Sequence, residues 1–108
     1  MDERRSFDRI QIPESAGVYA ATPQGERLGG IVMLGRGGFL LATGQKFESG
    51  QAREFVLTDE TQRVRTPVRA VARYTSSQGV GFEFEDLKAD AAVEIGVIIG
   101  KHSIQGQA

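Results

Sequence analysis

Three arginines near the start of the chain, Arg4, Arg5 and Arg9, have the residue type and spacing to bind an anion. A guanidinium group is a flat fork of N–H donors, so it can bind a phosphate with two hydrogen bonds, pair with the O6 and N7 acceptors of guanine, or stack on a purine. The alternative is a solvated, charged terminus in which Glu3 and Asp8 balance the arginines. The segment taken alone favours this alternative, so the sequence downstream has to decide between the two.

A glycine-rich turn between two apolar runs is the second candidate for chemistry. It reads Gly35-Arg36-Gly37-Gly38. Glycine allows close approach to the backbone and can expose N–H groups to an anion. The side chain of Arg36 adds a positive charge in the same turn. Such a turn could therefore contribute to a site for an anion.

A second set of arginines alternates with small and apolar residues in the segment 62–74. This period of two predicts a strand with one buried face and one exposed face. The exposed face carries Arg63, Arg65, Arg69 and Arg73. Such a face could bind an anion, but solvation with acidic partners on neighbouring strands is the favoured interpretation.

Other side chains that carry chemistry are sparse. The chain has no cysteine, which excludes disulfides, thiolate nucleophiles and cysteine zinc sites. The sole histidine, His102, lies near the chain end, and we predict a surface position for it. No metal-ligand cluster, histidine-activated nucleophile or phosphate loop with lysine is found. We therefore expect no catalytic residue, no metal and no cofactor, and a protein that is not an enzyme.

Length and charge limit the partners. The 108 residues correspond to one domain, and 13 basic against 14 acidic residues give a net charge of −1. A general DNA- or RNA-binding protein would show an excess of Lys and Arg, so neither partner is expected. No apolar stretch reaches the roughly 18 residues of a membrane span. The N-terminus also lacks the apolar core of a secretory signal, so we expect a cytoplasmic protein without membrane insertion.

The elements that must position these residues are short strands. Apolar runs separated by turn residues predict six of them. Their ranges are 18–21, 28–34, 39–42, 53–58, 62–74 and 80–84. Within the second strand Gly29 and Gly30 indicate a bulge or a close backbone approach, and in the fifth Pro67 indicates an edge position or a bulge.

A helical period follows the last strand. Leu87, Ala91, Ile95 and Ile98 are spaced by four, four and three residues. Asp86 is the candidate cap at the start of this helix, and residues 103–108 are expected to form a frayed tail. Gly96 and Gly100 are expected to allow tight packing or to end the helix.

Hairpin-connected strands followed by one helix indicate an all-β fold. We expect a small six-stranded antiparallel β-barrel or rolled sheet with a C-terminal α-helix, formed by residues 16–103 as a single domain. Residues 1–15 are expected to form a flexible N-terminal arm that carries the arginines.

Three motifs occur in a fixed order along the chain. The arginine segment contains Arg-x-x-x-Arg, formed by Arg5 and Arg9 and preceded by Arg4. The second motif is Met33-Leu34-Gly35-Arg36-Gly37-Gly38-Phe39-Leu40, and the third is Val80-Gly81-Phe82-Glu83-Phe84. In their order and strand spacing they resemble the PilZ domain family, which carries an arginine motif, then Asp/Asn-x-Ser-x-x-Gly, then Gly-Val-x-Phe. The resemblance covers residues 3–99.

The resemblance implies a PilZ-like β-barrel and a receptor or adaptor for cyclic di-GMP. Arg5 and Arg9 would hold guanine and phosphate groups of the ligand, and Arg4 would assist. The turn residues Gly35, Arg36, Gly37 and Gly38 would complete the ligand site. Binding would order the N-terminal arm and so present a new surface to an unidentified partner protein.

The second motif departs from the family pattern at two positions. Met33 stands where the family has Asp or Asn, and Gly35 stands where it has Ser. The alternative function is therefore a degenerate PilZ adaptor that binds no nucleotide and acts through protein contacts, in motility, pilus function or surface attachment. We expect Arg36 to replace part of what the two missing side chains supply.

Overall fold

The computed structural model of the chain describes residues 9–107, and side chains as far as His102. Its elements follow one another as β1 Arg9–Gln11, the 3-10 turn η1 Glu14–Ala16, β2 Val18–Ala21, β3 Arg27–Gly35, β4 Gly38–Ala42, β5 Ala52–Asp59, β6 Val64–Ser76, β7 Gly79–Phe84 and α2 Ala89–Gln107. Each of the six predicted strands is present, with ends shifted by at most two residues.

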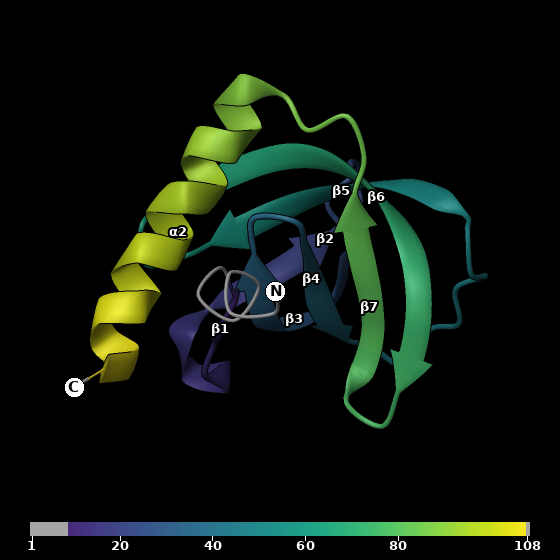
Figure 1. Cartoon of the computed structure of the whole chain (residues 1–108), viewed down its shortest axis with the longest axis horizontal. Coiled ribbons are helices and arrows are strands. Elements are labelled where there is room, and N and C mark those ends of the chain that lie inside the picture. Colours follow the sequence, from purple (N-terminus) through teal and green to yellow (C-terminus); the bar gives the residue numbers. More distant parts are fainter. Residues whose placement is uncertain (1–8, 108) are drawn as a thin grey trace, which may run out of the picture.

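The strands form a closed antiparallel barrel (Figure 1). The ring runs β3-β2-β5-β6-β7-β4 and closes because β4 also pairs with β3. The predicted six-stranded antiparallel β-barrel with a C-terminal helix is therefore confirmed. The short β1 is an addition: it pairs with the end of β3 that β2 leaves unpaired.

Aromatic side chains fill the middle of the barrel. Phe39, Phe55 and Phe82 come from three different strands, and their ring centroids lie 4.9–5.5 Å apart. Each of the three is at most 4% exposed. Because side chains alternate across a strand, the residue that follows Phe82 points outward, and Glu83 is exposed.

Strand β6 shows the predicted alternation. Thr66, Val68 and Ala70 are buried, whereas Arg65 and Arg69 are exposed. The edge position expected for a proline is also found, because residue 67 pairs with β5 alone and β7 joins β6 only from residue 70 onward. A proline there removes no bond to the second neighbour.

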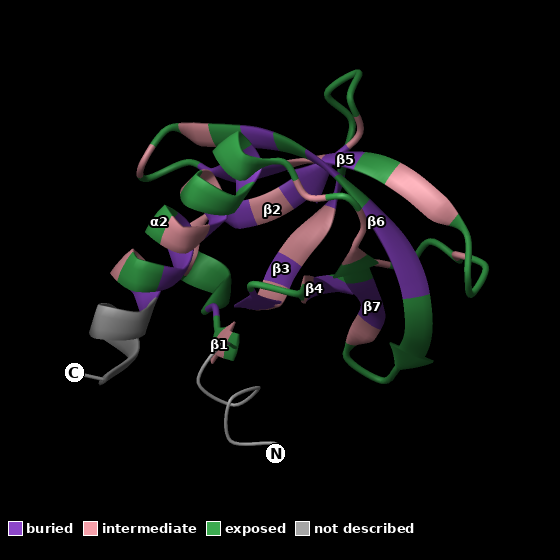
Figure 2. Cartoon of the chain, turned by 45° about the horizontal axis from the view of Figure 1, so that its top comes forward, coloured by how far each residue is buried: buried purple, intermediate pink, exposed green. Residues whose placement is uncertain are grey.

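The helix α2 lies along the barrel against β6, β1 and β3 (Figure 1). Its buried residues face the barrel and its exposed residues face away (Figure 2). Ala91, Ile95 and Ile98 are at most 4% exposed, as the helical stripe predicts. Leu87 precedes the helix but still packs, partly buried, against the core.

Three predictions about α2 are wrong. The helix begins at Ala89, so Asp86 lies in the preceding loop with a positive φ of 52° and does not cap it. The helix continues to Gln107 instead of fraying after residue 102. Gly96 and Gly100 do not lie at a close contact within the described part of the chain, because a Cβ on either would meet no atom within 4 Å. They also do not end the helix, which continues to Gln107.

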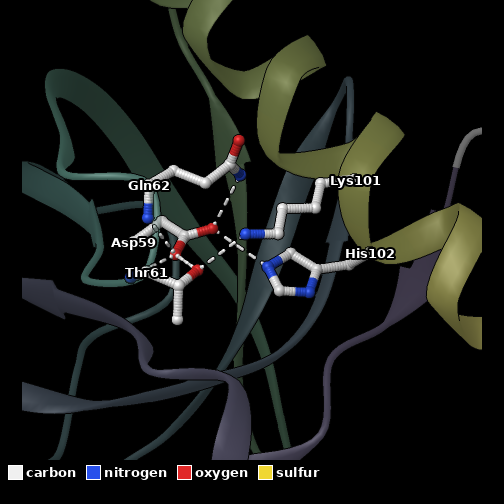
Figure 3. A network of polar contacts seen from close by, with 5 residues as sticks. All are labelled: Asp59, Thr61, Gln62, Lys101 and His102. Atoms are coloured by element: carbon white, nitrogen blue, oxygen red, sulfur yellow. Dashed lines mark hydrogen bonds and ion pairs between the residues drawn. The ribbon is translucent and has the colours of Figure 1, made fainter.

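A buried polar pair fastens the helix to the barrel (Figure 3). Nε2 of His102 lies 2.9 Å from Oδ2 of Asp59, the last residue of β5, and both residues are at most 3% exposed. The predicted surface position of His102 is therefore wrong. The same carboxylate accepts hydrogen bonds from Thr61 and Gln62 in the β5–β6 loop. Lys101 donates to the hydroxyl of Thr61 from the helix side.

The environment of Asp59 favours its charged form. Burial alone would raise the pKa of Asp59, but the hydrogen bonds from Thr61, Gln62 and His102, together with the charge of His102, lower it from 3.8 to about 2. Both oxygens of this buried carboxylate are hydrogen-bonded, and the pair links the helix to the end of β5, 43 residues away in sequence.

Candidate functional site

A cavity of about 420 Å³ opens on the outer surface of the barrel, where β1, the β3–β4 turn, β6 and β7 meet. Described residues of both predicted regions, the arginine segment and the glycine-rich turn, line this cavity. Arg9, Gly35, Arg36, Gly37 and Gly38 all line this cavity. Arg4 and Arg5 lie outside the described residues.

Arg9 is held at the cavity by β1. Its neighbour Ile10 packs partly buried against the core, and Ile12 is 4% exposed with its N–H bonded to the carbonyl of Val32. This alternation turns the side chain of Arg9 outward, and in the β1–β3 ladder Arg9 stands directly opposite Gly35. The arginine motif and the glycine turn, 26 positions apart in sequence, are thereby neighbours in space.

The β3–β4 turn is fixed from the other side by β7. Gly38 stands opposite Glu83 in the β4–β7 ladder, and the N–H of Phe84 donates to the carbonyl of Gly37 at 2.9 Å. A Cβ on Gly38 would collide with the carbonyl of Phe82, whereas a Cβ on Gly37 would meet nothing within 4 Å. The last glycine of the motif is thus required by the fold, while Gly37 leaves open space at the cavity.

Among the cavity residues that were not predicted as site residues, three have polar side chains: Arg73 and Tyr74 of β6, and Glu83 of β7. A register shift between Ala72 and Tyr74 interrupts the alternation of β6, so Arg73 and Tyr74 are both exposed. The ring of Tyr74 lies against Gly81, its partner in the ladder, and the residue stays 52% exposed.

Gly81 was the signal in the sequence that could have revealed Tyr74. A glycine inside a strand marks a place where another group comes close to the backbone. Here that group is an aromatic ring with one side open to solvent, next to a cavity lined by arginines. A purine could stack on this ring.

The arginines of β6 have acidic partners on neighbouring strands, as expected. Nε of Arg73 lies 2.6 Å from Oε1 of Glu83, and Nε of Arg69 lies 2.8 Å from Oε1 of Glu85. Glu54 of β5 lies 3.7 Å from Arg69 on the other side. The hydrogen bond from Arg69 to Glu85, together with the charge of Glu85, raises the pKa of Arg69. The acidic partners expected for this face are therefore present for Arg69 and Arg73.

The charge at the cavity differs from that of the chain. Its described lining carries the three arginines Arg9, Arg36 and Arg73 against the single carboxylate of Glu83. The chain as a whole has a net charge of −1. The cavity is therefore a local basic site that combines guanidinium groups, a glycine turn and an aromatic ring, which suits an anionic ligand with a flat base.

Two further properties bear on function. Between residues 9 and 102, no three His, Cys, Asp or Glu side chains gather closely enough to hold a metal ion. In the described part of the chain, no helix has the length and apolar character needed to cross a membrane.

Comparison with known proteins identifies the family of the chain. The family model for the PilZ domain matches residues 3–99. Among solved structures, an uncharacterised protein of Legionella superposes with a TM-score of 0.66 at 11% identity, covering 93% of this chain and 98% of its own. At that identity the likeness shows a shared fold only. No curated protein matches the sequence. The chain belongs to the PilZ domain family, whose members are ligand-binding receptors and adaptors for cyclic di-GMP rather than enzymes.

Proposed function

We propose that this protein is a cyclic di-GMP receptor that binds the dinucleotide in the cavity between Arg9 and the Gly35–Gly38 turn. The observation that carries the proposal is the register of β1 on β3, which sets Arg9 opposite Gly35. The described residue of the arginine motif, Arg9, and the glycine turn therefore line the same cavity.

The chemistry of the lining fits the ligand. Cyclic di-GMP has two phosphates and two guanines. Arg9 and Arg36 offer forked donors for phosphate oxygens or for O6 and N7 of guanine. The open side of the Tyr74 ring offers a stacking surface for a base. Gly37 leaves space for the ligand to approach the backbone.

Signalling would follow from the position of the arginine motif. Arg4 and Arg5 precede β1 by a few residues, so a ligand held by Arg9 can bring them over the cavity. We propose that this orders the part of the N-terminal arm that precedes β1 and creates a surface for a partner protein in the cytoplasm. Ordering a segment costs roughly 2–5 kcal/mol. Charge-assisted hydrogen bonds of about 1.5–3 kcal/mol each can offset that cost.

Calorimetric titration with cyclic di-GMP tests the proposal. Arg9→Ala and Arg5→Ala should each weaken binding by about 10- to 150-fold, because each removes charge-assisted hydrogen bonds. Arg65→Ala is the matched control, since Arg65 is an exposed arginine of β6 that does not line the cavity. Its affinity should stay within about 2-fold of the wild type.

Failure of the wild-type protein to bind at millimolar ligand would refute the receptor. The alternative function, an adaptor that acts through protein contacts without nucleotide, would then account for the family membership. Such a result would point to Met33, whose half-buried thioether lies in the cavity at the position where the family carries an acid or amide.

A further inference from the structure

Glu83 is unusual for its place in the cavity. Among the described residues that line it, Glu83 alone carries a carboxylate, and the remaining charges belong to arginines. A negative side chain beside a site for a ligand with two phosphates opposes binding unless it makes a contact of its own. The position of Glu83 shows which contact that is.

Glu83 lies next to the stacking surface. Tyr74 stands opposite Gly81 and covers it with its ring. Glu83 is two residues further along β7 and, by the period of a strand, on the same outer face, about 7 Å away. A purine stacked on Tyr74 would therefore have an edge beside the carboxylate of Glu83.

Arg73 orients this carboxylate without using all of its acceptors. Its Nε lies 2.6 Å from Oε1 of Glu83. A carboxylate has about four acceptor positions on two oxygens, so the second oxygen and part of the first remain available. The side chain of Glu83 is 57% exposed, and a ligand can reach it.

We propose that Glu83 selects guanine over adenine in this cavity, an inference that rests on the proposed receptor function. The Watson–Crick edge of guanine presents two donors side by side, N1–H and the 2-amino group, and a carboxylate accepts both. Adenine presents an acceptor, N1, at the same place, so its lone pair would face the negative oxygens. Glu83 thus supplies from β7 the acidic group that Met33 does not provide at the end of β3.

The same face of the sheet holds a matched control. Arg69 of β6 forms a similar pair at 2.8 Å with Glu85, which directly follows β7, but neither residue lines the cavity. If Glu83 served only as the partner of Arg73, neutralising Glu83 and neutralising Glu85 would have the same effect on ligand selection.

The test compares cyclic di-GMP with cyclic di-AMP by calorimetry on the full chain. The wild type should prefer cyclic di-GMP. In Glu83→Gln that preference should fall by about 5- to 150-fold, the worth of one bidentate base contact. Part of the change should come from a gain for adenine, because an amide can pair with N1 and the 6-amino group. Glu83→Ala should lose the guanine contact without this gain, and Glu85→Gln should keep the wild-type ratio.

The outcomes separate the two claims. If Glu83→Gln and Glu83→Ala keep the wild-type ratio of the two affinities, Glu83 does not select the base, while the receptor function stands. If the wild type binds neither dinucleotide, the receptor function fails and the role of Glu83 fails with it. Thermal unfolding of all three variants should stay within a few degrees of the wild type, since both glutamates are exposed pairs.

Discussion

Gly37 and Gly38 are adjacent in the sequence and meet opposite surroundings. A Cβ on Gly38 would collide with the carbonyl of Phe82 and force β4 and β7 apart, whereas Gly37 faces open space. Gly38→Ala should therefore lower the free energy of unfolding by about 1–3 kcal/mol. Gly37→Ala should change it by less than about 0.5 kcal/mol. Urea unfolding of the two variants measures the difference, and equal midpoints would show that the β4–β7 contact is not as tight as described.

Tyr74 is the residue on which we expect a base of the ligand to stack. Stacking of a base on an aromatic ring contributes about 1–3 kcal/mol, so Tyr74→Ala should weaken cyclic di-GMP binding by about 5- to 150-fold. Tyr74→Phe keeps the ring and should bind like the wild type. Fluorescence or calorimetric titration of the two variants decides the point. Wild-type affinity in Tyr74→Ala would mean that the base lies elsewhere.

At the scale of elements, the Asp59–His102 pair makes the docking of α2 sensitive to acid. The pKa of Asp59 falls from 3.8 to about 2 on folding, so its contribution to stability is fully present above pH 3.8. It is lost as the pH falls through about 2. The two values differ by nearly two units, which corresponds to about 2 kcal/mol.

Denaturant unfolding from pH 6 to pH 2 measures this contribution. The wild type should lose about 2 kcal/mol more stability over that range than Asp59→Asn, which has no carboxyl group to protonate at this position. This comparison uses only how the free energy of unfolding changes with pH in each protein. The pH-independent loss of stability caused by the substitution therefore does not affect it. Parallel curves for the two proteins would contradict the hydrogen bonds assigned to the Asp59 carboxylate.

The elements with long, regular patterns were predictable from the sequence. The alternation from Val64 to Ala70 fixes the buried face of β6, and a stripe spaced by three and four residues fixes the buried face of α2. The arginine motif and the glycine turn identified part of the cavity for the same reason, since their types and spacing are local.

The features that escaped prediction depend on contacts between distant segments. His102 pairs in the interior with Asp59, which ends β5 43 residues earlier, and nothing beside His102 in the sequence marks that partner. Strand β1 shows its alternation only through Ile10 and through Ile12 directly after it, too few residues to distinguish a strand from a charged arm. Tyr74 joins the site through a register shift in β6 that no local pattern announces.

At the scale of the molecule, the barrel builds a basic site on a chain that is not basic. The closed ring brings the N-terminal strand, the β3–β4 turn and the β6–β7 ladder to one cavity, and three arginines gather there although the net charge is −1. Affinity for cyclic di-GMP should therefore fall as salt is raised, because phosphates are contacted. No general affinity for nucleic acid is expected from so small a basic area.

The most direct measurement is a titration of the ¹⁵N-labelled full chain with cyclic di-GMP, followed through the backbone amide resonances. If the protein is the proposed receptor, the amide shifts of residues 4–9, of the Gly35–Gly38 turn and of Arg73, Tyr74 and Glu83 should change saturably. The amide shifts on the buried face of α2 should stay unchanged. Unchanged resonances of the turn and of residues 4–9 at saturating dinucleotide would contradict the receptor function and leave only the fold.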